Sequence, residues 1–283
     1  MVMIMAQQNT SALAHLASPF LLVGAGRMGS AMLEGWLKLG LPPQHVRVED
    51  PSPSTDVVNI LAAYGAQGAT QPLQGKAGIV VLAVKPQMLD SVAPRLREVI
   101  GPDTLVISIL AGKTLGGLDA AVPHARAIIR AMPNTPASIG RGITAMIANG
   151  QVAPAQRELA SAIMKAVGQV VWLDNETQMD AVTAVSGSGP AYVFLLAEQL
   201  AKAGEAAGLP ASLAAQLARQ TVAGAGELLN QSELDPAQLR QNVTSPAGTT
   251  AAALAVLMGQ NGLGDVLIQA VAAATQRSRE LAR

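Results

Sequence analysis

Short apolar runs alternate with helical stretches through the first half of the chain. The runs are rich in Val, Ile and Leu, and between them apolar residues recur at three- and four-residue spacing, which is typical of amphipathic helices. This alternation predicts a parallel sheet with crossover helices. We expect strands at 20–23, 46–49, 79–84, 104–109, 127–130, 143–147 and 170–173, and helices at 28–39, 55–64, 88–100 and 154–166.

The pattern changes after Asp174, where Ala and Leu dominate and no strand is predicted. Gly208-Leu209-Pro210 is typical of a helix end followed by a helix start. The apolar faces are so wide that burial on one side would not cover them, so we expect subunit contact; a tightly packed monomeric bundle is the alternative. The expected helices are 190–207, 211–230, 249–258 and 264–281.

The chain is long enough for two ordinary domains. We expect a flexible N-terminal tail at 1–17, an α/β domain at 18–174 and an all-α domain at 175–283. Charge is balanced, with 19 Lys+Arg against 19 Asp+Glu, and only 2% of the residues are aromatic. Such a surface offers neither a basic face for phosphate backbones nor stacking platforms for bases, which argues against nucleic acid as a partner.

Several classes of chemistry are excluded by composition. The chain has no cysteine, so thiolate nucleophiles, disulfides and thiolate metal sites are ruled out. His15, His45 and His124 are far apart in sequence and lie in no metal-binding motif, so no metal is expected. No apolar run reaches the roughly 18 residues of a membrane span, and Met1–Met5 lacks the basic start of a signal peptide. We expect a cytoplasmic protein whose chemistry comes from a bound cofactor.

A glycine-rich motif follows the first expected strand and begins a helix. It reads Gly24-Ala25-Gly26-Arg27-Met28-Gly29, in the spacing G-x-G-x-x-G. The first glycine permits a tight turn and the second lets the backbone approach a pyrophosphate, which would lie at the helix N-terminus. A plain turn is the alternative interpretation.

An acidic pair, Glu49-Asp50, ends the second expected strand. An acid at this place ordinarily accepts a hydrogen bond from the adenosine ribose 2′-hydroxyl and would repel a 2′-phosphate. Asp50 therefore predicts that NADH is used at least as well as NADPH. A solvated acidic loop is the alternative.

Three further segments follow strands and should lie at the carboxyl edge of the sheet, where ligands bind in open parallel sheets. They are Ala83-Val84-Lys85-Pro86, Ser108–Gly112 (which includes Ala111) and the stiff loop Met132–Pro136. Each alone is only a turn, and Lys85 alone would be a surface charge.

A second cluster of hydroxyls and backbone N–H groups lies in the helical half, where residues 242–250 read NVTSPAGTT and lead into an apolar run. It could bind a carboxylate as the glycine loop binds phosphate. Helix capping by Ser and Thr is an equally good interpretation of this stretch alone.

Taken together, these segments resemble the pyrroline-5-carboxylate reductase family from about Pro19 to Leu281. The resemblance rests on six stretches in the same order: GAGRMG at 24–29, AVKP at 83–86, ILAG at 109–112, RAMPNTP at 130–136, DAVTAVSGSGPAY at 180–192 and VTSPAGTT at 243–250. It implies a Rossmann-like domain followed by a helical domain that interleaves with a partner's, giving a homodimer that often builds into a decamer. It also implies NAD(P)H-dependent reduction of 1-pyrroline-5-carboxylate to L-proline.

The resemblance also implies roles for individual residues. Gly248 and Thr249 would donate backbone N–H groups to the substrate carboxylate, and the Thr250 hydroxyl would hydrogen-bond the ring nitrogen as the catalytic group. Ser245 and Asn242 match positions near the nicotinamide end, while Glu176 and Glu233 match acidic positions on the substrate side. The cofactor-binding set would be Gly24, Gly26, Arg27, Met28, Gly29, Asp50, Ala83, Val84, Lys85, Pro86, Ala111, Gly112 and Asn242.

The sequence departs from the family pattern at Asp50, where many members carry a small hydroxyl residue that binds the NADPH 2′-phosphate. Thr70 replaces an Asn that commonly contacts the adenosine side, and Gly78 replaces a usual Asp. One alternative function is a hydroxyacid dehydrogenase of related architecture, which would need a Lys or Asn where Gly189–Leu196 has neither. The others are a non-catalytic dinucleotide sensor and a reductase of a related cyclic imine.

Overall fold

The computed structural model describes residues 13–14, 16, 18–66 and 75–282. Most of the expected tail (1–12, 15 and 17) and Thr70 lie outside these described residues. Packing separates two compact units: the described residues up to Gly187 together with those from Gln276 onward, and Ser188–Thr275. The boundary expected after Asp174 stays a prediction, because these units group residues by contact alone.

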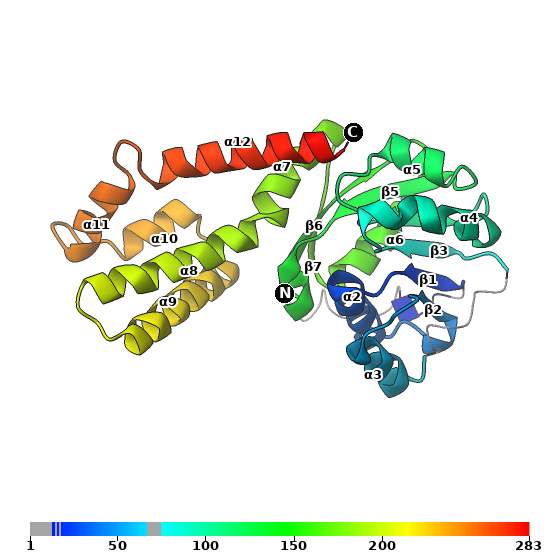
Figure 1. Ribbon diagram of the computed structural model, residues 1–283, viewed down its shortest axis with the longest axis horizontal. Helices are drawn as coiled ribbons and strands as arrows, with labels where there is room; N and C mark the ends of the chain where they lie inside the picture. Colours follow the sequence, from blue (N-terminus) through cyan, green and yellow to red (C-terminus); the bar gives the residue numbers. More distant parts are fainter. Residues whose placement is uncertain (1–12, 15, 17, 67–74, 283) are drawn as a thin grey trace. The chain divides into compact units, whose positions relative to one another are not determined.

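The first unit is built around a seven-stranded sheet with the order β2-β1-β3-β4-β5-β6-β7 (Figure 1). Strands β1 to β5 are parallel, and β1 lies between β2 and β3, so the winding direction reverses there. β6 is antiparallel to β5 and parallel to β7, so the sheet is not parallel throughout as the alternation predicted. The strands are Phe20–Val23 (β1), Val46–Glu49 (β2), Ile79–Leu82 (β3), Leu105–Ser108 (β4), Ala127–Met132 (β5), Gly142–Ala148 (β6) and Gly168–Trp172 (β7).

Helices cover both faces of this sheet. Successive side chains of a strand point to opposite faces, so Leu22 and Val81 join one core cluster while Leu21 and Val80 join another. The first cluster packs under α2, α3 and α6, and the second under α4 and α5. Burial on both faces explains why these strands are apolar without alternation. The helices are Arg27–Lys38 (α2), Thr55–Tyr64 (α3), Leu89–Val99 (α4), Leu115–Ala121 (α5) and Pro154–Lys165 (α6).

The second unit is helical, as expected. Its helices α8 and α9 form an antiparallel pair (Figure 1). Small residues bring them together: a Cβ on Gly204 would lie 3.2 Å from that of Ala214. The helices are Gly189–Ala206 (α8), Ala211–Gln231 (α9), Pro236–Asn242 (α10), Thr249–Leu257 (α11) and Leu263–Leu281 (α12), the last of which ends in the first unit.

Large apolar side chains of the second unit remain uncovered in the single chain. Within Ser188–Thr275 only Ala214 and Ala218 are buried. By contrast, Phe194 is 69% exposed and Ile268 is 71% exposed. Exposed apolar surface on this scale marks an interaction face. These exposed side chains are consistent with the expected subunit contact.

Residues near both limits of the described structure pack on the first unit. The Ser278 hydroxyl near the end of α12 donates a 2.7 Å hydrogen bond to the Asp180 carboxylate in α7 (Met179–Val182). Leu13, within the expected tail, is fully buried in the core cluster that contains Trp36. Leu13 and the half-buried Leu16 of that tail are therefore packed against the sheet domain.

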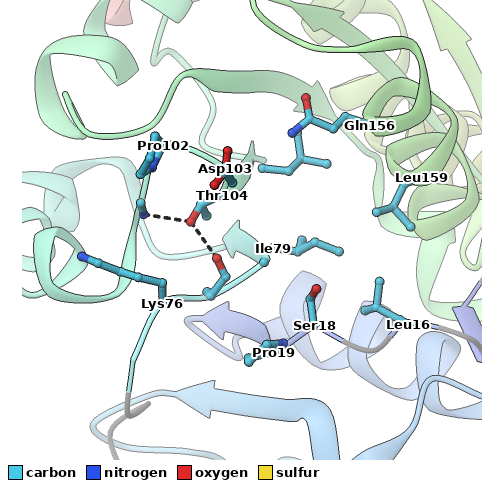
Figure 2. A pocket seen from close by; sticks show the side chains of 14 residues that line it. Leu16, Ser18, Pro19, Lys76, Ile79, Pro102, Asp103, Thr104, Gln156 and Leu159 are labelled. Carbon is cyan, nitrogen blue, oxygen red and sulfur yellow. Dashed lines mark hydrogen bonds between the residues drawn. The ribbon is translucent and has the colours of Figure 1, made fainter.

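A cavity of about 360 Å³ lies at the amino ends of β1, β3 and β4. Figure 2 shows Thr104 at its wall, where the hydroxyl accepts the Gly101 N–H and donates to the Ala77 carbonyl. Ligands of parallel sheets bind at the opposite, carboxyl edge, so we assign this cavity no function. Among the described residues, no helix is both long and apolar enough to cross a membrane.

Candidate functional site

The glycine loop is the turn between β1 and α2. Gly24 has a φ of +87°, and a Cβ there would lie 2.8 Å from the backbone N of Val84, just past the end of β3. Its own N–H donates to the Glu49 carbonyl at 2.8 Å. Only glycine fits this turn, which holds the carboxyl ends of β1, β2 and β3 together.

The helix that follows begins without a side-chain cap. Gly26 is the N-cap, the first turn contains no acid, and the first backbone bond runs from Ser30 N–H to Gly26 O at 2.8 Å. The N–H groups of Arg27, Met28 and Gly29 find no acceptor in the described part of the chain. A Cβ on Gly26 would meet nothing within 4 Å, so the backbone is open to an incoming group. These residues fit the pyrophosphate of a dinucleotide.

Asp50 lies against this loop from the end of β2. Its Oδ2 accepts the Ala25 N–H at 2.8 Å, and its Oδ1 accepts the Ser52 N–H at 2.9 Å. Each carboxylate oxygen has a second lone pair, so both can still accept a hydroxyl. The neighbouring Glu49 carboxylate pairs instead with Arg95 at 3.5 Å. Asp50 is therefore the carboxylate that is hydrogen-bonded to the glycine loop, and its predicted role toward the ribose stays a prediction.

The other predicted cofactor segments also end strands of the sheet. Ala83 and Val84 lie against Gly24, while Lys85 is exposed at the start of a short 3₁₀ turn. Ala111 is exposed after β4. A Cβ on Gly112 would lie 3.1 Å from the carbonyl oxygen of Leu281, so the end of α12 closes on this turn.

One ion pair at this edge was not predicted from the sequence. Arg130, in β5, is buried, with a side-chain exposure of 5%, and its Nη1 lies 2.8 Å from Glu176 Oε1. The same Oε1 accepts the Leu115 N–H at the start of α5, also at 2.8 Å. The signal available in the sequence was a single cation within an otherwise apolar strand, which needs a buried partner.

The SPAGTT turn begins α11 in the second unit. The Gly248 N–H donates to the Ser245 carbonyl at 3.1 Å, and Ala247 is left-handed with a φ of 58°. A Cβ on Gly248 would overlap the Ser245 hydroxyl. The first helical bond is Ala252 N–H to Gly248 O at 3.2 Å, and α11 has neither a side-chain cap nor an acid in its first turn.

The start of α11 resembles the start of α2. The N–H groups of Thr249 and Thr250 have no acceptor among the described residues, and the half-buried Thr250 hydroxyl likewise has none. Asn242 ends α10, and its side-chain oxygen accepts from Gln238 at 2.9 Å. Glu233 is exposed in the loop before α10. The predicted substrate residues other than Glu176 thus lie in the second unit, and the predicted cofactor residues other than Asn242 in the first.

Two family models match the chain. The model described as pyrroline-5-carboxylate reductase dimerisation matches residues 176–281, and the model described as NADP oxidoreductase, coenzyme F420-dependent, matches residues 20–112. A pyrroline-5-carboxylate reductase from Synechocystis is 44% identical over 264 residues, which cover 93% of this chain and 97% of the relative.

Solved structures agree with these matches. A pyrroline-5-carboxylate reductase from Coxiella burnetii has a TM-score of 0.87 at 38% identity, covering 95% of this chain and all of the other. A pyrroline carboxylate reductase from Plasmodium falciparum, with NADP bound, has a TM-score of 0.76 at 30% identity, covering 94% of this chain and 99% of the other.

Proposed function

The chain belongs to the pyrroline-5-carboxylate reductase family, and we propose that it reduces 1-pyrroline-5-carboxylate to L-proline, the last step of proline biosynthesis. The observation that carries this proposal is that the glycine-rich turn and the SPAGTT turn each lead into a helix without a side-chain cap, α2 in the first unit and α11 in the second, and these two helix starts suit two different anions. The start of α2 suits the pyrophosphate of a dinucleotide, and the start of α11 suits a carboxylate.

The SPAGTT turn is proposed to hold the substrate. The N–H groups of Gly248 and Thr249 bind its carboxylate, with the Gly248 N–H changing its acceptor from the Ser245 carbonyl. The Thr250 hydroxyl hydrogen-bonds the ring nitrogen, which stabilises the protonated imine and then the amine. Ser245 and Asn242 lie toward the nicotinamide end in this proposal, and Glu233 on the substrate side.

Little acid–base machinery is needed for this reaction. Protonation activates the C5=N bond, and when bound, the reduced nicotinamide supplies the hydride to C5. The chain contributes by orienting two reactants and excluding water, a form of catalysis that needs no metal. Among the described residues no three metal-binding side chains cluster together.

For the cofactor we propose that NADH serves at least as well as NADPH. The proposed set is the glycine loop with Gly24, Gly26, Arg27, Met28 and Gly29, together with Asp50, AVKP at 83–86, Ala111 and Gly112. The negative charge of Asp50 beside the loop disfavours a 2′-phosphate, and its free lone pairs suit a ribose hydroxyl.

We also propose a homodimer, in which the uncovered apolar faces of α8, α9, α11 and α12 pack against those of a partner. Assembly of such dimers into a decamer is part of the same proposal. The cytoplasmic location expected from the sequence stays a prediction.

The role of the SPAGTT turn is tested by removing the carboxylate from the substrate. We expect 1-pyrroline to be reduced with a kcat/KM about 10²-fold below that of 1-pyrroline-5-carboxylate, because it forfeits charge-assisted bonds to the turn. Equal values for the two imines would contradict a carboxylate site. Dinucleotide binding without turnover of either imine would favour a sensor.

A further inference from the structure

The Arg130–Glu176 pair joins three segments of the first unit. Arg130 belongs to β5, two residues before the start of the MPNTP loop. Leu115, whose N–H shares the same Glu176 oxygen, begins α5 shortly after the ILAG turn. Glu176 itself begins the short turn that leads into α7. A single carboxylate oxygen thus links the segments next to two of the loops at the carboxyl edge of the sheet.

The burial of Arg130 makes the loss of this link costly. The Arg130 guanidinium is almost fully covered, and Glu176 is its ion-pair partner at 2.8 Å in the described structure. A buried cation that loses its partner is left uncompensated in a poorly solvated place, so the surrounding segments must rearrange. The register of the sheet sets Arg130 beside Ser108, the last residue of β4, so a rearrangement there reaches the ILAG turn directly.

We propose that Glu176 is a positioning residue for the dinucleotide, acting through Arg130 and Leu115 and without contact to the substrate. Its Oε1 fixes the ILAG turn and the MPNTP loop relative to each other, so that the edge of the sheet is preformed when the dinucleotide arrives. This inference rests on the proposed dinucleotide site. It adds that Glu176 holds the ILAG turn and the MPNTP loop of that site in place.

The structure favours this role over a substrate contact. Both hydrogen bonds of the Glu176 side chain in the described structure use Oε1, and both hold this side chain to the sheet domain. Its side chain is only 30% exposed, and the cation that balances its charge is already present in the fold. Glu176 therefore does not need a protonated imine to balance its charge, because Arg130 already does so.

A double-mutant cycle on the full-length protein tests the proposal, with the dissociation constant of NADH or NADPH measured by titration without substrate. We expect Glu176→Gln to raise this constant about tenfold, the size of one lost hydrogen bond. We expect Arg130→Met to do the same, and the double variant to be no weaker than the worse single variant, because both changes break one link. If either single variant folds poorly, the double variant can still be measured, because it leaves no unpaired buried charge.

The matched control is Glu98→Gln, which removes an exposed carboxylate near the end of α4 in the same unit. It should leave the dissociation constant unchanged. The proposal is overturned when Glu176→Gln binds the dinucleotide normally and raises only KM for pyrroline-5-carboxylate, or when the two changes act additively. Because binding is measured without turnover, a protein inactive on this imine would contradict the proposed function and still test the positioning role.

Discussion

The carboxylate of Asp50 accepts the backbone N–H of Ala25 at 2.8 Å, which ties the end of β2 to the turn that follows β1. The acid proposed to select the cofactor is thus also part of the loop that would bind the pyrophosphate. A change at Asp50 can therefore act through charge or through loop geometry, and the two are separable by choice of substitution.

Replacing Asp50 by Asn removes the charge and keeps one oxygen that can accept the Ala25 N–H, at the loss of the weaker turn bond from the Ser52 N–H. We expect the ratio of kcat/KM for NADPH to that for NADH to rise about tenfold, because a nearby like charge no longer repels the 2′-phosphate. Glu49→Gln is the control, since the Glu49 carboxylate pairs with Arg95 and should have little effect on the ratio. A wild-type ratio in the Asp50 variant would mean that this carboxylate does not select the cofactor.

Thr250 is expected to contribute through its hydroxyl alone. Thr250→Ala should lower kcat/KM for pyrroline-5-carboxylate by about 10²-fold or less, the size of one polar contact in the transition state. Thr250→Ser keeps the hydroxyl and should restore most of the rate. Steady-state kinetics of the three proteins decide the matter: an alanine variant with unchanged kinetics removes Thr250 from the mechanism.

A Cβ at position 248 would overlap the Ser245 hydroxyl and lie 3.2 Å from the Ser245 carbonyl oxygen, so the Ser245 side chain and the turn would have to shift. Gly248→Ala should displace the N–H groups and raise KM for the substrate about tenfold, with the affinity for the dinucleotide preserved. Gly150→Ala, whose added Cβ would meet nothing within 4 Å, is the control. A Gly248 variant with normal KM would show that the turn does not hold the substrate.

The predicted interface contains Phe194, which is 69% exposed in the single chain. Phe194→Glu should shift the protein toward monomer, because burying an unpaired carboxylate in an apolar interface is costly. Light scattering across a concentration series measures this shift. Lys202→Ala on the same helix changes an exposed charge and should keep the wild-type mass. If the Phe194→Glu variant has the wild-type mass at every concentration, Phe194 does not lie in the interface.

The periodicity of apolar residues predicted the fold closely. All seven strands and the helices expected in each unit are present, with ends within two residues of their predicted positions. The helices that were missed are short. α5 contains two adjacent glycines, α7 is a single turn that continues into the π-helical turn Thr183–Gly187, and α10 has seven residues that are mostly polar, so none of the three presents a full apolar face. Periodicity also cannot reveal strand direction, so the antiparallel β6 was not predicted.

The candidate site was predicted less completely. Glycine spacing identified the turn after β1, because backbone geometry there depends on local sequence. The bond from Ala25 to Asp50 and the ion pair of Arg130 with Glu176 join residues distant in sequence, and only the fold brings them together. The left-handed backbone of Ala247 likewise follows from the turn geometry and not from residue type.

The central claim is that this chain reduces pyrroline-5-carboxylate to proline at the expense of a reduced nicotinamide dinucleotide. The most direct measurement follows loss of the ultraviolet absorbance of NADH and NADPH in parallel with L-proline, identified by chromatography. We expect one proline for each dinucleotide oxidised, with NADH at least as effective as NADPH. Purified, oligomeric protein that binds a dinucleotide and forms no proline with either one would contradict the account.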